Sequence, residues 1–247
     1  MFDGRSPRLA TDHNFLKGTM WSLPITFGAI VGGFLAAVVA YAVVGGWRDE
    51  TLAVAVAGAV QLFAGLAIIF VFAREWAGDG FARAVGLRIK VSDWWMFFVG
   101  FGLQIVIVLA VLDPLIRLLN IEQPEQQQIA EIIAAASGVV GVVALMVVTT
   151  VLAPIIEEII YRAVLLRAIL RLGVRDSTAI VLSAAVFASI HLVDPQAALV
   201  VPGLFVLGVV LSYVTLKSGD LSRAILIHAG VNSLAAIALV VSNTSVA

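Results

Sequence analysis

The sequence predicts an all-α membrane protein, built as a polytopic bundle of about seven transmembrane helices. Of its 247 residues, 62% are hydrophobic and only 13% are charged, whereas about a quarter of the residues in a typical soluble domain are charged. The mean hydropathy is +1.09. We therefore expect a multi-pass protein of the cell membrane, with membrane lipid as a direct partner of its surface.

Seven apolar runs have the length of roughly 20 residues that a helix needs to cross a hydrocarbon core. They lie at 21–44, 52–73, 94–112, 137–160, 177–193, 197–216 and 221–241. The fourth run is expected to continue as one long helix to about Leu172. Residues 1–20 are polar, so we expect no cleavable signal peptide.

The distribution of Lys and Arg predicts the orientation. Most of these residues fall in alternate segments that begin with the N-terminus, and only Arg48 and Arg117 fall in the segments between. The majority set is Arg5, Arg8, Lys17, Arg74, Arg83, Arg88, Lys90, Arg167, Arg171, Arg175, Lys217 and Arg223. The positive-inside rule therefore predicts a cytoplasmic N-terminus and, with seven spans, an external C-terminus.

Two regions and two connecting loops complete the predicted organisation. Residues 1–136 hold the cytoplasmic tail and the first three helices, and residues 137–247 hold the last four helices with the polar groups discussed below. The loop 78–92 mixes basic and apolar residues, which fits either a segment on the inner membrane surface or a solvated connector. The loop 121–136 is polar and then apolar, as in an outer approach to the fourth span.

The fourth span contains the most unusual stretch of the chain. Glu157, Glu158 and Arg162 interrupt a sequence that is otherwise almost entirely apolar, and ionisable groups at membrane depth usually mark a functional interior. Glu158 precedes Arg162 by four residues, the favourable order for an intrahelical ion pair, so this pair has a mainly structural interpretation. Glu157 points about 100° away from it and is the better candidate for a free general base.

Two later spans carry the remaining intramembrane polar pairs. Phe187 precedes His191 by four residues, and His228 precedes Asn232 by four, so each pair shares one helix face. Taken singly, each histidine is more simply a satisfied core residue, Asn232 an interhelical hydrogen-bonding group and Phe187 a packing residue beside the imidazole. Taken together with the glutamates, they indicate three helix faces that converge on one site.

The sequence lacks the residues or motifs that several classes of function require. The chain has no cysteine, which excludes disulfides, thiolate nucleophiles and iron–sulfur clusters. It contains neither an H-E-x-x-H helix nor a G-x-S-x-G elbow. No basic stripe with interleaved aromatic residues is present, so no nucleic-acid partner is expected.

The polar motifs and their order resemble a known family. E-E-x-x-x-R (Glu157 to Arg162), F-x-x-x-H (Phe187 to His191) and H-x-x-x-N (His228 to Asn232) are similar to the three motifs of the CAAX-processing endopeptidase and bacteriocin-processing (CPBP, Abi, type II CAAX prenyl endopeptidase) family of intramembrane proteases. The resemblance covers about residues 140–240. Ala163 and the Ser222-Arg223 pair depart from the family's usual pattern, outside the proposed catalytic positions.

The resemblance implies an intramembrane endopeptidase that cuts a membrane-associated peptide or protein, with prenylated substrates as one option. In that assignment Glu157 and His191 activate water, His228 and Asn232 stabilise the oxyanion, and Glu158, Arg162 and Phe187 support them. Peptide hydrolysis needs such a base and such donors. Two other functions stay open: a non-catalytic membrane protein of the same fold, such as a bacteriocin immunity factor or scaffold, and a proton-coupled transporter.

The sequence leaves the cofactor open. Glu157, His191 and His228 could bind one Zn²⁺ with a position free for water, as in a metalloprotease. The same residues could also act without a metal, as a glutamate-type protease. Asn232 is a poor zinc ligand and a good oxyanion donor, which favours the second alternative.

Overall fold

The computed structural model of the protein describes residues 22–46, 49–73, 80–121, 132 and 138–244. This part of the chain is built of helices and contains seven that are long and apolar enough to cross a membrane. The prediction of an all-α, seven-span bundle is thus confirmed, and the protein is a multi-pass membrane protein by helix composition. The cytoplasmic placement of the N-terminus stays a prediction, as does the division into regions 1–136 and 137–247. Most of the loop 121–136 lies outside the described residues.

The helices follow the predicted runs closely, with two differences. The first two spans are α2 (Ser22–Val44) and α3 (Glu50–Ala73). The third is η2 (Val91–Asp93), α5 (Met96–Ile107), the π-helical turn η3 (Val108–Leu112) and α6 (Asp113–Leu118). It therefore ends six residues later than the hydropathy predicted, because Asp113 and Pro114 fit the first turn of α6.

The fourth span is one long rod, as predicted. It consists of α8 (Val139–Val147), the π turn η4 (Val148–Leu152), α9 (Ala153–Glu158), the π segment η5 (Ile159–Leu166) and α10 (Arg167–Arg171). Its π turns are a feature that hydropathy does not predict. We call this rod, Val139–Arg171, the motif helix.

The last three spans form the other side of the bundle. They are α11 (Asp176–Ser189) with η6 (Ile190–Val193), α12 (Val201–Ser218) and α13 (Ser222–Thr244). The sixth span starts later than predicted because Pro195–Leu199 forms a separate 3-10 turn, η7. Gly219 ends α12 in the left-handed conformation, with φ of 76°, which a residue without a Cβ adopts at low cost.

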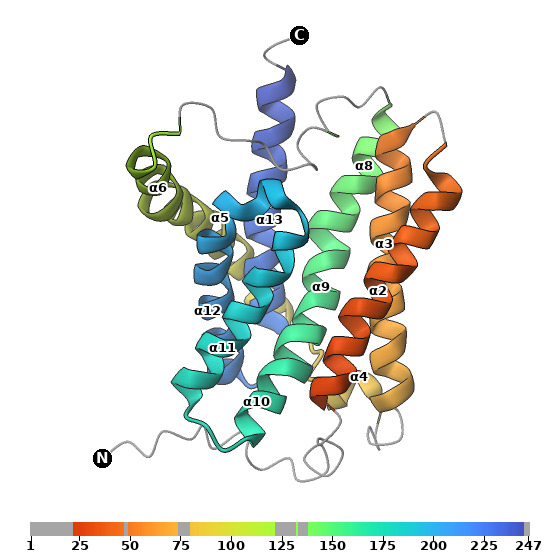
Figure 1. Cartoon of the computed structure of the whole chain (residues 1–247). Coiled ribbons are helices and arrows are strands. Elements are labelled where there is room, and N and C mark those ends of the chain that lie inside the picture. The colour runs from red at the N-terminus through yellow and green to blue at the C-terminus, as the bar shows by residue number, and fades with distance from the viewer. Residues whose placement is uncertain (1–21, 47–48, 74–79, 122–131, 133–137, 245–247) are drawn as a thin grey trace.

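The motif helix runs through the middle of the bundle (Figure 1), with the α2–α3 pair on one side and α11, α12 and α13 on the other. The main hydrophobic core contains residues of all these elements, including Ile25, Ile69, Ile160, Leu211 and Ile227. Outside this core the helices expose large apolar side chains, for example Val43 at 76%. Such a surface fits lipid surroundings.

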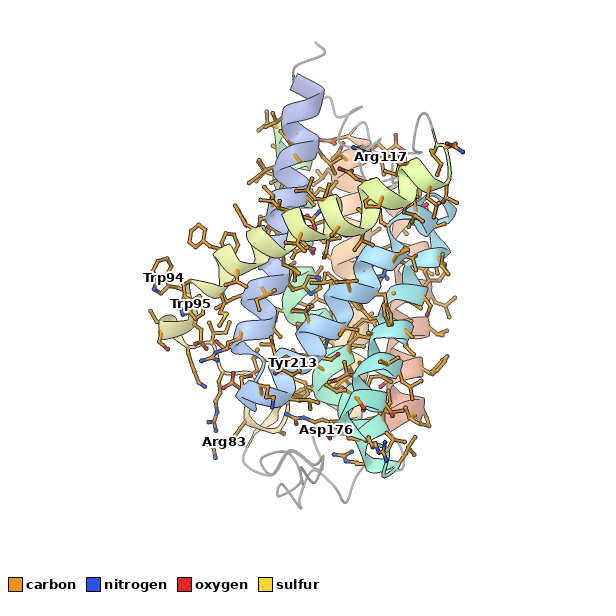
Figure 2. All side chains as sticks on the ribbon, turned by 90° about the vertical axis from the view of Figure 1, so that its left-hand side faces the viewer. Arg83, Trp94, Trp95, Arg117, Asp176 and Tyr213 are labelled. Atoms are coloured by element: carbon orange, nitrogen blue, oxygen red, sulfur yellow. The ribbon has the colours of Figure 1, made fainter. Side chains whose placement is uncertain are left out.

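Helix α5 and its continuation α6 cross the bundle obliquely (Figure 2), from Trp94 and Trp95 at one end to Arg117 at the other. The two tryptophans project away from the other helices and are 62% and 47% exposed. Tryptophan is the residue that membrane proteins enrich at the boundary between lipid and water. The start of α5 therefore has the composition of an interfacial anchor.

Residues 80–93 pack on the turn between α12 and α13. The short helix α4 (Phe81–Ala84) leads to Val85, which is fully buried. Leu221 N–H donates to the Gly86 carbonyl at 3.1 Å, and the Lys90 ammonium pairs with Asp220. Neither alternative for the loop 78–92 included these contacts, which tie the first half of the chain to the base of α13.

Candidate active site

The two glutamates lie at the end of α9 and face different surroundings. The side chain of Glu158 is fully buried, whereas that of Glu157 is 21% exposed. This difference follows from the helix, because neighbouring residues point about 100° apart. Glu158 faces the protein interior and Glu157 faces a partly open position.

Glu158 is held by Arg162, which lies one turn further along the motif helix. The Arg162 Nη1 atom is 3.1 Å from Glu158 Oε1, and both side chains are 0% exposed. The guanidinium carbon lies 4.5 Å from the centroid of the Phe187 ring, and Nη2 reaches the Gly208 carbonyl at 3.5 Å. A buried ion pair needs such additional partners, because its desolvation opposes the attraction between the charges.

His228 of α13 lies between the two carboxylates. Its Nδ1 is 2.9 Å from Glu158 Oε1, and its Nε2 is 3.8 Å from Glu157 Oε2. An ionised carboxylate only accepts hydrogen bonds, so Nδ1 carries the proton of the shorter contact. Glu158 thereby fixes the ring, and the longer distance leaves Nε2 and Glu157 without a direct hydrogen bond.

The Phe187 ring packs against both imidazoles. Its centroid lies 5.3 Å from that of His191 and 5.8 Å from that of His228, each edge to face. Phe187 is fully buried, and Tyr161 covers it at 5.2 Å. One aromatic side chain therefore joins the histidines of α11 and α13 and supports the Arg162 guanidinium.

His191 lies in η6, where α11 tightens into a 3-10 turn, and it is half-buried. Its Nδ1 is 2.9 Å from the Phe187 carbonyl oxygen. A carbonyl can only accept, so Nδ1 carries the hydrogen and Nε2 keeps its lone pair in the neutral ring. Within the described part of the chain, no hydrogen bond or ion pair joins His191 to Glu157.

Asn232 lies one turn beyond His228 on the same face of α13. Its amide nitrogen donates to the main-chain carbonyl of Thr149 at 2.9 Å. Thr149 belongs to the π turn η4 of the motif helix. No sequence pattern indicated this partner, because the contact joins a side chain to the backbone of a distant helix.

Two glycines hold α13 against α5. A Cβ atom at Gly100 would lie 2.2 Å from the Ile227 carbonyl oxygen and 2.9 Å from the Cα of Gly230. The backbones of the two helices therefore touch between His228 and Asn232. Sequence reasoning missed these residues, since a glycine in an apolar run does not reveal what it faces.

The structure thus brings most of the predicted site together. Glu158, Arg162, Phe187 and His228 form one contact network, and Glu157 lies at its edge beside His228. His191 joins through Phe187, and Asn232 is bonded one turn away.

The metal set considered from the sequence receives no support from the geometry. Among the residues that the structure describes, no three His, Asp or Glu side chains are grouped so that they could hold a metal ion. Glu157, His191 and His228 therefore do not form a ready zinc site in this arrangement.

The fold and the site define a class of protein: a seven-span membrane bundle with a buried carboxylate and imidazole network between its central and C-terminal helices. Residues 139–234 match the family model described as type II CAAX prenyl endopeptidase Rce1-like. This segment is an Rce1-like domain of the CPBP family, and it contains all the site residues named above apart from Gly100. No curated protein and no solved structure matches the chain.

The family match covers the motif helix, α11, α12 and the first part of α13. Membership in this protease family implies an endopeptidase that acts on a peptide substrate, with prenylated proteins as the substrate class in the family's description. The oblique helix α5, which carries Gly100, lies outside the matched segment.

Proposed function

We propose that the protein is an intramembrane endopeptidase in which Glu157 acts as the general base on a water molecule. The observation that carries this proposal is the contrast between the two glutamates. Glu158 is fully buried and bound by Arg162 and His228, whereas Glu157 is partly exposed and lies 3.8 Å from His228, beyond hydrogen-bond distance. A base has to be reachable and uncommitted.

His191 completes the water position. With Nδ1–H donated to the Phe187 carbonyl, Nε2 is the nitrogen that can accept a hydrogen bond from water. Glu157 takes one proton from the water molecule, and the water oxygen attacks the carbonyl carbon of the peptide. The carbonyl π bond opens and its electron pair moves to the oxygen, which becomes the oxyanion.

His228 and Asn232 are the donors for that oxyanion. As an imidazolium, His228 donates from both ring nitrogens, with Nδ1 held by Glu158 and Nε2 left for the substrate. The proton on Glu157 then passes to the leaving nitrogen, the C–N bond breaks, and a carboxylic acid and an amine are released. Water and peptide supply all the atoms of the products.

The substrate we propose is a membrane-associated peptide, with a prenylated C-terminal peptide as the class that the family suggests. The test is cleavage of a peptide library, with and without prenylated C-terminal segments, by purified protein in detergent or liposomes. Loss of the Glu157 base in Glu157→Ala is expected to lower the rate by about 100- to 10,000-fold.

Asp113→Ala serves as the matched control, because this carboxylate starts α6 outside the network. We expect it to cleave at the wild-type rate. Full activity of Glu157→Ala would overturn the assignment of the base. A folded wild-type protein that cleaves nothing would favour the non-catalytic alternative.

A further inference from the structure

The motif helix contains a main-chain carbonyl, that of Thr149, whose expected donor within the helix falls on a proline. In the π turn η4 the bonding register is five residues, since the N–H of Ala153 donates to the Val148 carbonyl. In that register the next pair is residue 154 with the Thr149 carbonyl. Residue 154 is proline, which has no N–H. The Thr149 carbonyl is therefore left without a main-chain donor in this register.

The hydroxyl of Thr149 does not replace that donor. Its Oγ1 turns back to the preceding turn and donates to the carbonyls of Leu145 and Met146, at 3.0 and 3.2 Å. The missing donor comes from α13, where the Asn232 amide nitrogen lies 2.9 Å from the Thr149 oxygen. Because a carbonyl only accepts, the nitrogen of the carboxamide has to be the atom that faces it.

We propose that Asn232 is a positioning residue that clasps α13 to the motif helix at the carbonyl that Pro154 leaves unpaired. Glu157 and Glu158 follow Pro154 within about one turn, and His228 precedes Asn232 by one turn. The clasp thus sets the position of both carboxylates relative to the imidazole between them. Its catalytic consequence rests on the proposed function, whereas the clasp itself is a statement about packing and stability.

The clasp also limits what Asn232 offers a substrate. One of its two amide hydrogens is committed to Thr149, so a single N–H and Oδ1 are left for other partners. Asn232 therefore gives at most one hydrogen bond to an oxyanion. Its contribution to turnover combines this bond with the positioning of the motif helix.

The chain contains a natural control for the proline. The π turn η3 (Val108–Leu112) is followed by Asp113-Pro114 in the same pattern in which η4 is followed by Ala153-Pro154. Leu109, which corresponds to Thr149, is 62% exposed on the outside of its helix. Replacing Pro114 restores an N–H in the same local setting without touching the clasp.

The experiment is a double-mutant cycle of Asn232→Ala and Pro154→Ala, measured as thermal unfolding midpoints of the full chain in detergent. Asn232→Ala is expected to lower the midpoint by about 3 °C or more, since a part-buried carbonyl loses its donor. In the Pro154→Ala background, the alanine introduced after Ala153 supplies an N–H for the Thr149 carbonyl. Asn232→Ala is therefore expected to lower the midpoint there by less than half as much as in the wild type. In the Pro114→Ala background the full drop persists.

An equal drop in all three backgrounds overturns the clasp. If N232A alone does not fold, a folded N232A/P154A protein supports the clasp, and failure of the double variant to fold overturns it. Peptide cleavage is measured in parallel as separate kcat and KM. Positioning predicts that N232A lowers kcat more than it raises KM, and that P154A does not restore kcat, because the new N–H satisfies the Thr149 carbonyl without joining α13 to the motif helix. A wild-type kcat in N232A, or full recovery of kcat in N232A/P154A, overturns the catalytic part.

The two proposals fail in different ways. A wild-type protein without peptidase activity contradicts the proposed function, but the coupling of the unfolding midpoints would still be measured. An active protein without that coupling contradicts the clasp alone.

Discussion

The crossing of α5 and α13 at Gly100 and Gly230 gives the sharpest structural prediction. A methyl group at position 100 would lie 2.2 Å from the Ile227 carbonyl oxygen and 2.9 Å from the Val231 nitrogen. These are backbone atoms of the helix that carries His228, and no side-chain rotation can move them. The substitution Gly100→Ala therefore has to push the two helices apart.

The size of the effect follows from the contact distances. A carbon and a carbonyl oxygen approach to about 3.3 Å, so the helices must separate by about 1 Å. Overpacking of this kind costs about 1–3 kcal/mol, and each kcal/mol lowers the unfolding midpoint of a chain of this size by about 2–4 °C. A misplacement of about 1 Å at the donors of a catalytic site can cost about 100-fold in rate.

The assay compares peptide cleavage and thermal unfolding of Gly100→Ala with those of Gly102→Ala. Gly102 lies on the same helix, and a Cβ there would meet nothing within 4 Å, so this variant is expected to keep wild-type activity. Wild-type cleavage and an unchanged midpoint for Gly100→Ala would contradict the predicted clash. Equal losses in both variants would show that alanine disturbs α5 itself rather than the crossing.

Two further predictions concern buried charge. Arg162→Met removes the guanidinium partner of the buried Glu158 carboxylate, leaves it only the contact with His228, and is expected to destabilise the fold by about 3–5 kcal/mol. Arg162→Lys also loses stability, because an ammonium cannot reproduce the contacts of the guanidinium with Glu158, Gly208 and Phe187. Chemical unfolding measures both variants, and a wild-type unfolding curve for Arg162→Met would contradict the first expectation. Asp220→Ala removes the acceptor of the Ser222 N–H at the start of α13 and should lower the free energy of unfolding by about 1 kcal/mol. Lys90→Met should lower it less, because the Lys90 side chain is half-exposed. The reverse order in thermal unfolding would show that this interpretation of the α12–α13 turn is wrong.

The architecture could largely be predicted from the sequence, because lipid imposes a simple rule on length and hydropathy. The seven runs and the continuation of the fourth to about Leu172 depend on that rule alone. The π turns η3 and η4 could not be predicted from hydropathy, since the hydropathy of a run carries no information on the register of its backbone hydrogen bonds. Pro154 indicates that one carbonyl of the preceding turn lacks a main-chain donor. Which carbonyl this is depends on whether the backbone hydrogen bonds of that turn span four or five residues.

The site could be predicted in part, where it depends on spacing along one helix. The pairing of Glu158 with Arg162 and the packing of Phe187 beside His191 follow from the four-residue spacing. Contacts between different helices could not be predicted in this way, because no spacing along the sequence indicates them. The binding of His228 to Glu158 is one example, because intrahelical spacing says nothing about which side chain a third helix brings.

The role of Glu157 is tested most directly by the cleavage rate of Glu157→Gln, a variant that keeps the shape of the side chain and removes its basicity. The proposed mechanism predicts a rate lower by about 100- to 10,000-fold. The unfolding midpoint should stay within about 2 °C of the wild type, because Glu157 is partly exposed and its contact with His228 is longer than a hydrogen bond. Cleavage at the wild-type rate would contradict the mechanism.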